Sequence, residues 1–161
     1  PFRRLHIDGM DTSIDIVNCH PVLVQQLVRR YAPEFKCPNL AKYVANREDV
    51  RDTIMKLYGV SKDNVKDLFI AMMFGGRYTK WFKENKIKKA PSKYIRDFNN
   101  ELLEISTNVA PEKIPNYSVF QKIALDKKTE HEDDDKPRRS AFALYLQHDE
   151  STCIEVLIDS L

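Results

Sequence analysis

The sequence predicts an α+β fold that is predominantly helical, with short antiparallel strands near the N-terminus. Only 4 of the 161 residues are glycine, which is too few for a β-sandwich rich in turns. Apolar residues also recur at helical spacing, as in the series Val65, Leu68 and Met72. Hydrophobic residues make up 42% of the chain, which excludes a disordered protein. We therefore expect one domain with a helical core.

The N-terminal strands are expected at residues 5–7 and 13–17, with a turn near Gly9 between them. Pro21 then opens a helix, because proline is tolerated in the first helical turn, where its missing N–H has no partner to lose. The second predicted strand therefore runs almost directly into a helix.

The rest of the chain is predicted to be helical apart from one loop. Ser61 is an expected N-cap, and Gly59 and the pair Gly75-Gly76 are expected helix ends. The last segment fits a helix, which we favour over a hairpin with residues 148–150 at its tip. The predicted order is a strand–helix segment, two helical segments, a flexible charged loop and a C-terminal helix: residues 1–36, 37–90, 91–126, 127–139 and 140–161.

Composition and spacing exclude several classes of protein. The formal net charge is only +2, so any basic surface has to come from local clustering. No apolar run is long enough to span a membrane, and the N-terminal residues lack the layout of a signal peptide. The three cysteines and four histidines show neither a disulfide framework nor zinc-ligand spacing. We expect an intracellular protein with reduced thiols and no membrane partner.

Two segments carry residues suited to binding a nucleotide. Asp15 ends the second predicted strand beside a helix N-terminus, where a carboxylate can hold a divalent cation with a polyphosphate. Lys62, Lys66, Phe69 and Phe74 fall near one face of a predicted helix, where cations one turn apart can follow a triphosphate and a ring can wall off a base. Ordinary solvated lysines and buried rings would give the same pattern.

A basic stretch with interleaved aromatic residues follows that helix. Residues 56–89 contain nine Lys or Arg against three acids. Cations that neutralise phosphates beside rings that stack on bases favour binding to nucleic acid, although a solvated amphipathic helix would look similar. The candidate nucleic-acid contacts are Arg77, Tyr78, Lys80, Trp81 and Lys83.

In chain order, these segments resemble the palm and fingers motifs of family A DNA polymerases, in a divergent form similar to sequences from large viruses and selfish elements. Asp15 before the Asn18-Cys19-His20-Pro21 junction resembles the metal-binding strand end of the palm. The Lys62, Lys66, Phe74 and Gly75 series keeps the spacing of the fingers helix motif. The resemblance implies a partial palm carrying a helical, fingers-like bundle.

The resemblance also implies roles for these residues. Asp15 would bind two catalytic Mg²⁺ ions with a second carboxylate, and Lys62 and Lys66 would hold the triphosphate of an incoming dNTP. Phe74 and Gly75 would abut the base, and His20 would take the place of a glutamate that supports the sugar. The partners implied are a DNA primer–template and dNTPs, with a remaining polymerase segment or other replication proteins.

The second metal carboxylate has two candidate locations. The tripeptide His148-Asp149-Glu150 matches the hairpin tip of the third polymerase motif literally and would make Asp149 catalytic. In the alternative alignment, which we favour, these residues belong to the helix before that motif, and the motif lies beyond Leu161. The chain would then be part of a catalytic domain for template-directed nucleotidyl transfer.

Two other classes of function stay open at the level of sequence. A helical nucleic-acid-binding or replication-scaffold module would use the basic residues 77–89 and no metal. A protein-binding adaptor would use neither the lysines nor Asp15.

Overall fold

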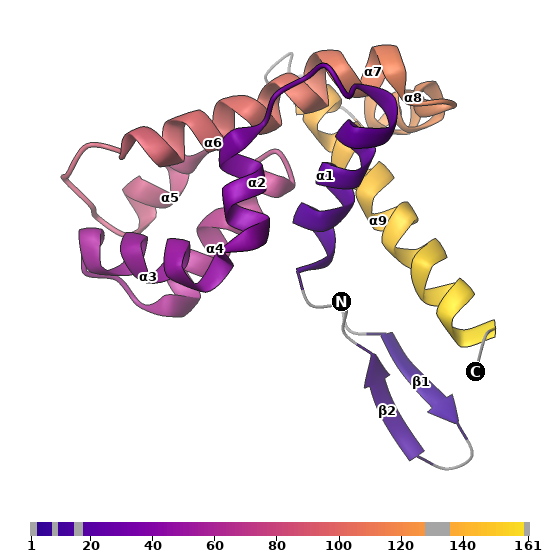
Figure 1. Ribbon diagram of the computed structural model, residues 1–161, viewed down its shortest axis with the longest axis horizontal. Coiled ribbons are helices and arrows are strands. Elements are labelled where there is room, and N and C mark those ends of the chain that lie inside the picture. The colour runs from indigo at the N-terminus through magenta and orange to yellow at the C-terminus, as the bar shows by residue number, and fades with distance from the viewer. Residues whose placement is uncertain (1–2, 8–9, 15–17, 128–135, 160–161) are drawn as a thin grey trace.

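The computed structural model describes residues 3–7, 10–14, 18–127 and 136–159, and these form a helical body with an N-terminal hairpin (Figure 1). The hairpin consists of β1 (Arg3–Ile7) and β2 (Met10–Ile14), which pair antiparallel. Figure 1 shows it projecting away from the helices, beyond the start of α1 (Cys19–Tyr31).

The predicted α+β class with a partial palm is wrong. The described chain is helical almost throughout, with nine α-helices and one π-helical turn, and no palm-like sheet is found among the described residues. The first expected strand, 5–7, lies within β1; of the second, expected at 13–17, only Ser13 and Ile14 lie in β2, which begins earlier, and residues 15–17 lie outside the described residues. The physical reason is that a palm needs a broader sheet to bury one face, whereas a lone two-stranded ribbon buries little.

The first three helices follow the local signals in the sequence. Pro21 lies in the first turn of α1, as predicted. After a loop come α2 (Pro38–Ala45) and α3 (Arg47–Tyr58), and α3 ends at Gly59, whose φ of 66° is left-handed and suits glycine.

The next helix, α4 (Lys62–Met73), is bounded by two well-defined caps. The Ser61 hydroxyl accepts a hydrogen bond from the Asn64 amide at 3.2 Å. At the other end, the Gly75 amide donates to the Met72 carbonyl and the Gly76 amide to the Ala71 carbonyl, which is the Schellman arrangement. These caps fix where α4 starts and where the chain turns away from it.

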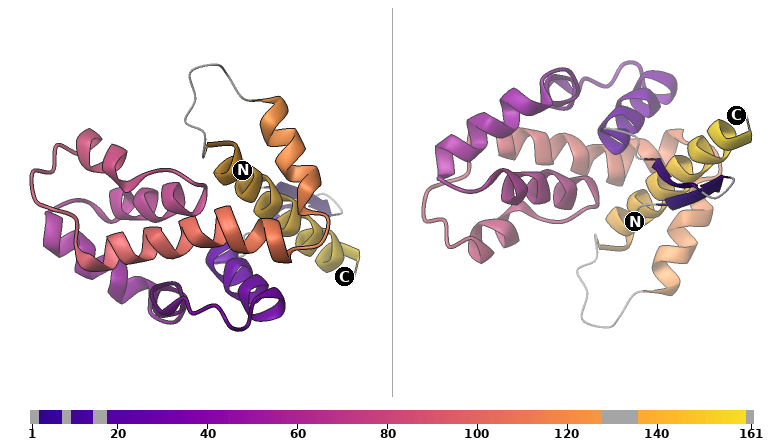
Figure 2. Two further views of the ribbon diagram at one scale, coloured as in Figure 1. Left: turned by 90° about the horizontal axis from the view of Figure 1, so that it is seen from above. Right: turned by 90° about the horizontal axis from the view of Figure 1, so that it is seen from below.

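A long helix organises the rest of the molecule. After α5 (Tyr78–Glu84), helix α6 (Lys93–Glu104) continues through a π-helical turn, η1 (Ile105–Val109), into α7 (Ala110–Lys113). Figure 2 shows this rod running along the body from the α2–α5 end to the end that holds α8 and α9. The core beside it contains Phe69, whose ring stacks on Tyr43 at 4.4 Å and meets Phe98 edge-on at 5.2 Å. Helix α4 is thereby anchored through its buried face.

The C-terminal part is a pair of packed helices, α8 (Tyr117–Asp126) and α9 (Lys136–Asp159). Helix α9 also packs on α1 and the π-helical turn. The last four residues predicted for the charged loop, 136–139, belong to α9, so the loop boundary at 139 is wrong; residues 128–135 lie outside the described residues. The helix favoured for 140–161 agrees with α9 as far as Asp159. Among the described residues, no helix is both long and apolar enough to cross a membrane.

Candidate functional site

Three residues from distant parts of the sequence meet at the start of α1. The imidazole of His20 lies edge-on to the ring of Phe74, with the ring centroids 4.8 Å apart and the planes inclined at 71°. On its other side, His20 Nε2 lies 3.3 Å from Glu150 Oε2 on α9. The fold therefore brings together His20 and Phe74, two residues that the sequence assigned to a nucleotide site, and places the neighbour of Asp149 beside them.

Burial controls the charge of this cluster. Burial lowers the pKa of His20 below its usual 6.5, and the nearby Glu150 carboxylate opposes that shift only in part. His20 Nε2 and Glu150 Oε2 lie within the distance of an ion pair, but the two groups are not aligned as a hydrogen bond. Next to it, burial, and then Glu150 and Cys153, raise the pKa of the Cys19 thiol to about 12. His20 is therefore neutral at pH 7, and Cys19 is a protonated thiol with no nucleophilic character.

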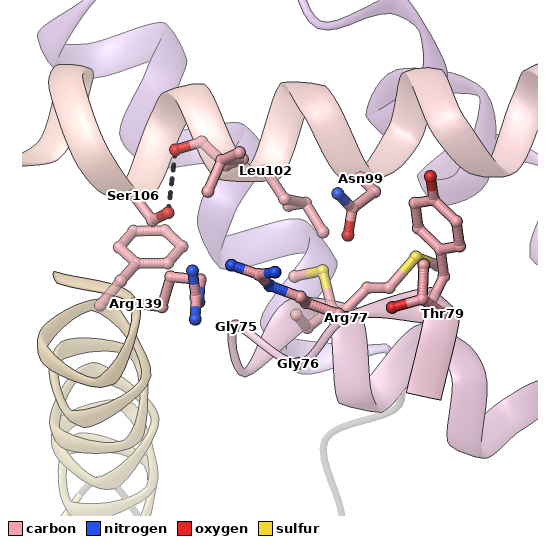
Figure 3. Close-up of a pocket in the computed structure, with 13 residues that line it drawn as sticks. Gly75, Gly76, Arg77, Thr79, Asn99, Leu102, Ser106 and Arg139 are labelled. Carbon is pink, nitrogen blue, oxygen red and sulfur yellow. Dashed lines mark hydrogen bonds between the residues drawn. The ribbon is translucent and has the colours of Figure 1, made fainter. Parts of the chain in front are cut away.

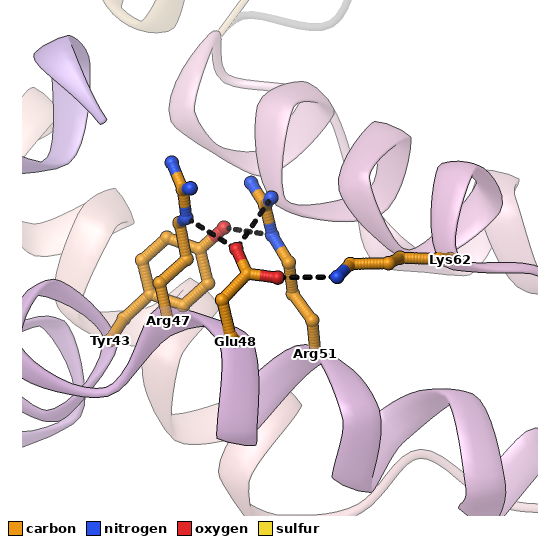
Figure 4. Close-up of polar contacts among 5 residues, drawn as sticks. All are labelled: Tyr43, Arg47, Glu48, Arg51 and Lys62. Carbon is orange, nitrogen blue, oxygen red and sulfur yellow. Dashed lines mark hydrogen bonds and ion pairs between the residues drawn. The ribbon is translucent and has the colours of Figure 1, made fainter. Parts of the chain in front are cut away.

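The two lysines of α4 lie on the surface, at the opposite end from Phe74. Lys62 is in the first turn, where its Nζ lies 2.6 Å from Glu48 Oε2 of α3 (Figure 4). Lys66 is exposed one turn further along. Phe69 does not share their face, because its ring is only 1% exposed in the core. The expected stripe of two lysines and a ring is therefore wrong at Phe69.

A cavity of about 230 Å³ opens where α4 ends, and two arginines line it (Figure 3). Arg77 comes from the turn after α4 and Arg139 from the first turns of α9. Asn99 and Ser106 from the α6 rod add polar atoms. Guanidinium groups can bind an anion such as a phosphate.

Gly75 allows a close approach between two of the elements that line this cavity. Its φ is 78°, and a Cβ added there would lie 3.3 Å from the main-chain carbons of Arg139 and closer still to its Cβ. The turn after α4 and the start of α9 therefore approach too closely for a side chain at this position. Gly75 was predicted to abut a base, whereas the structure places it against α9.

The aromatic residues of the basic stretch are mostly internal. Trp81 is 5% exposed, and its indole Nε1 donates to the Asn64 carbonyl at 2.7 Å, so the prediction that Trp81 stacks on a base is wrong. Tyr78 is half-buried with its ring against Phe82. The cations are on the surface, as expected: Arg77, Lys80 and Lys83 are exposed, and Lys80 also pairs with Glu84 at 3.7 Å.

The predicted carboxylates do not form a metal site in the described part of the chain. Asp15 lies outside the described residues. Asp149 is on helix α9 rather than at a hairpin tip, so the hairpin alternative is wrong; it lines a groove of about 350 Å³ with Arg30, Tyr31 and Tyr145. Among the described residues, no group of three or more His, Cys, Asp or Glu side chains is arranged to hold a metal ion. A Mg²⁺ site that includes Asp15 therefore stays a prediction.

No family model matches this chain, and no solved structure does. It is similar to a protein of Sputnik virophage named "Putative helicase V13", with 31% identity over 71 residues. The match covers 44% of this chain and 9% of the virophage protein, so the chain spans about a tenth of that relative.

Several polar residues of the site were not found from the sequence. Arg139 is the last residue of the charged segment that was predicted to be a loop. Glu150 reaches His20 only because α9 packs against α1. Glu48 looked like an ordinary acidic residue in the first turn of a helix. Arg139 and Glu150 depend on contacts between helices far apart in the chain, for which one sequence carries no local signal, and Glu48 depends on its contact with Lys62 of the next helix.

Proposed function

We propose that this chain is the nucleotide- and nucleic-acid-binding part of a template-directed nucleotidyltransferase, a DNA polymerase-like replication protein. One observation carries the proposal. His20 and Phe74, which the resemblance assigns separately to the sugar and base of an incoming dNTP, touch each other although they lie on α1 and at the end of α4. A chance match of spacing on one helix gives no reason for that contact.

Residues along α4 and beyond its end could bind the other parts of such a ligand. The exposed Lys66 ammonium on α4 offers a point charge for a triphosphate. Neutral His20 and the Phe74 ring form an apolar wall for the nucleoside. The cavity between Arg77 and Arg139 would accept a phosphate of the template or primer strand.

The proposal concerns binding and positioning. Mg²⁺ remains a prediction that requires Asp15 and a second carboxylate outside the groups described above. The similarity to a virophage protein named as a helicase supports a replication setting, because helicases also act on nucleic acid.

Nucleotide binding tests the proposal directly. A fluorescent dNTP is titrated into the full chain, and Lys66→Ala is compared with Lys122→Ala, which removes the same charge from the exposed helix α8. We expect Lys66→Ala to weaken binding by roughly 3- to 10-fold at low salt, as expected for one charge-assisted contact. Equal affinities for the two variants, or no binding by the wild type, would refute the proposal.

A second candidate is a non-catalytic nucleic-acid-binding or replication-scaffold module. The exposed cations at and after α5, which include Lys80, Lys83 and Lys89, favour it, because they need no nucleotide site. Under this alternative, Lys83→Ala lowers the affinity for single-stranded DNA and the salt dependence of binding, whereas the chain has no measurable affinity for a dNTP.

A further inference from the structure

One exposed carboxylate is surrounded by three cations on the α3–α4 side of the molecule. Glu48 Oε1 lies 3.0 Å from Arg47 Nε and 3.7 Å from an Arg51 terminal nitrogen, and Glu48 Oε2 lies 2.6 Å from Lys62 Nζ (Figure 4). These four side chains carry three positive charges and one negative charge, and the Asp52 carboxylate also acts on Lys62 electrostatically.

Arg51 is held in place by the fold, whereas Glu48 and Lys62 are exposed and Glu48 is replaceable. Arg51 is only 11% exposed; its Nε donates to the Tyr43 hydroxyl at 2.9 Å, and its guanidinium lies 5.7 Å from the centre of the Tyr43 ring. Glu48 is 49% exposed and Lys62 56% exposed. Ion pairs at such exposure contribute little to folding, so a ligand can displace Glu48 at small cost.

We propose that Arg47, Arg51 and Lys62 form a binding site for a phosphate group, and that Glu48 occupies this site as an internal competitor when no ligand is bound. The inference rests on the proposed function, since it completes the surroundings of Lys62, and it adds two arginines and a competing carboxylate that the family resemblance did not supply.

A phosphate is the ligand that this geometry favours. A phosphate group presents three acceptor oxygens and carries up to two negative charges, against two oxygens and one charge for a carboxylate. Arg51 offers donors in a planar fork, Arg47 a second guanidinium and Lys62 a point charge. Exchange of Glu48 for phosphate therefore gains electrostatic energy around the same three cations.

The test removes the competitor without removing any cation. Inorganic tripolyphosphate is titrated into the wild type and the Glu48→Gln and Glu84→Gln variants. Glu84→Gln is the matched control, because it makes the same change of charge at an exposed carboxylate that pairs with one lysine, Lys80, at 3.7 Å. We expect Glu48→Gln to bind tripolyphosphate more tightly than Glu84→Gln, because only the first variant removes the competing carboxylate. The difference should be roughly 3- to 10-fold, since each exposed ion pair contributes only a small free energy. Equal affinities of the two variants overturn the proposal.

Removal of the lysine gives an independent check. Lys62→Ala should bind tripolyphosphate more weakly than Lys80→Ala, and Glu48→Gln should tighten binding less when combined with Lys62→Ala. A Lys62→Ala affinity that matches Lys80→Ala contradicts the site.

Two further titrations identify the source of the phosphate. If Glu48→Gln tightens binding of dATP but not of a single-stranded oligonucleotide, the site takes a nucleotide triphosphate; the reverse result assigns it to a nucleic-acid backbone. Failure of the proposed function would be seen separately, as loss of the difference between Lys66→Ala and Lys122→Ala with the fluorescent dNTP. The tripolyphosphate comparison at Glu48 requires no recognition of a base.

Discussion

Gly75 lies at the joint between the end of α4 and the start of α9, and its replacement by alanine should be unusually costly. Two effects add at this position. The left-handed backbone, with a φ of 78°, costs an alanine about 1–2 kcal/mol of stability relative to glycine. The new methyl group also enters the space of the Arg139 Cβ, and overpacking of this kind costs about 1–3 kcal/mol. We therefore expect Gly75→Ala to lower the free energy of unfolding by about 2–5 kcal/mol.

Gly59→Ala is the matched control for this prediction. Gly59 also has a left-handed backbone, with a φ of 66°, but a Cβ there would meet no atom within 4 Å. Only the backbone cost applies, about 1–2 kcal/mol. Urea denaturation of the wild type and both variants, followed by circular dichroism, measures the difference. Equal losses of stability would show that α9 does not pack against the turn after α4, and the cavity between Arg77 and Arg139 would lose its structural basis.

Three further changes test other contacts of the fold. Trp81→Phe keeps a buried ring but removes the indole hydrogen bond to a main-chain oxygen of α4, and should cost about 1–2 kcal/mol in urea denaturation; an unchanged midpoint would contradict the internal position of the indole. Glu101→Gln replaces a carboxylate whose two oxygens accept the first amides of α2, at 3.0 and 2.9 Å, and should cost about 1 kcal/mol by the same assay, whereas a neutral effect would refute this cap. Burial lowers the pKa of His20 in the folded chain, so near and below the usual value of 6.5 the unfolded chain binds more protons than the folded chain. The free energy of unfolding should therefore fall as the pH is lowered from about 7.5 to about 5.5, and it should fall less in His20→Gln. Parallel pH profiles of the wild type and His20→Gln would contradict this prediction.

Helix ends were predictable because their signals are local. Ser61, Gly59 and Pro21 each act on main-chain groups within four residues, so a single sequence contains the whole interaction. The predicted helix ends and the N-cap at Ser61 agree with the structure for that reason. The size of the N-terminal sheet was not predictable, because alternation of apolar and polar residues over five positions does not specify how many strands pair.

The site was predictable only in part, for a related physical reason. The basic stretch after α4 contains both aromatic and cationic side chains at helical spacing, and the sequence alone does not determine which face of that helix packs against the core. The structure turns Trp81 inward, where its N–H finds the Asn64 carbonyl 17 positions earlier in the chain, and leaves Lys80 and Lys83 outside. Composition therefore identified the charge of this surface correctly and its aromatic partner incorrectly.

Helix α4 joins the two candidate binding regions through a single rigid element. Its first turn holds Lys62 against Glu48 of α3, and the residues that follow its last turn meet both α1, through Phe74, and α9, through Gly75. The buried ring of Phe69 fixes the helix between them by stacking on Tyr43, whose hydroxyl also accepts the hydrogen bond from Arg51. A phosphate that replaced Glu48 would thus bind beside Arg51, a side chain already tied to the core. Any shift of α4 that followed would reach the contact between His20 and Phe74, because a packed helix moves as a unit.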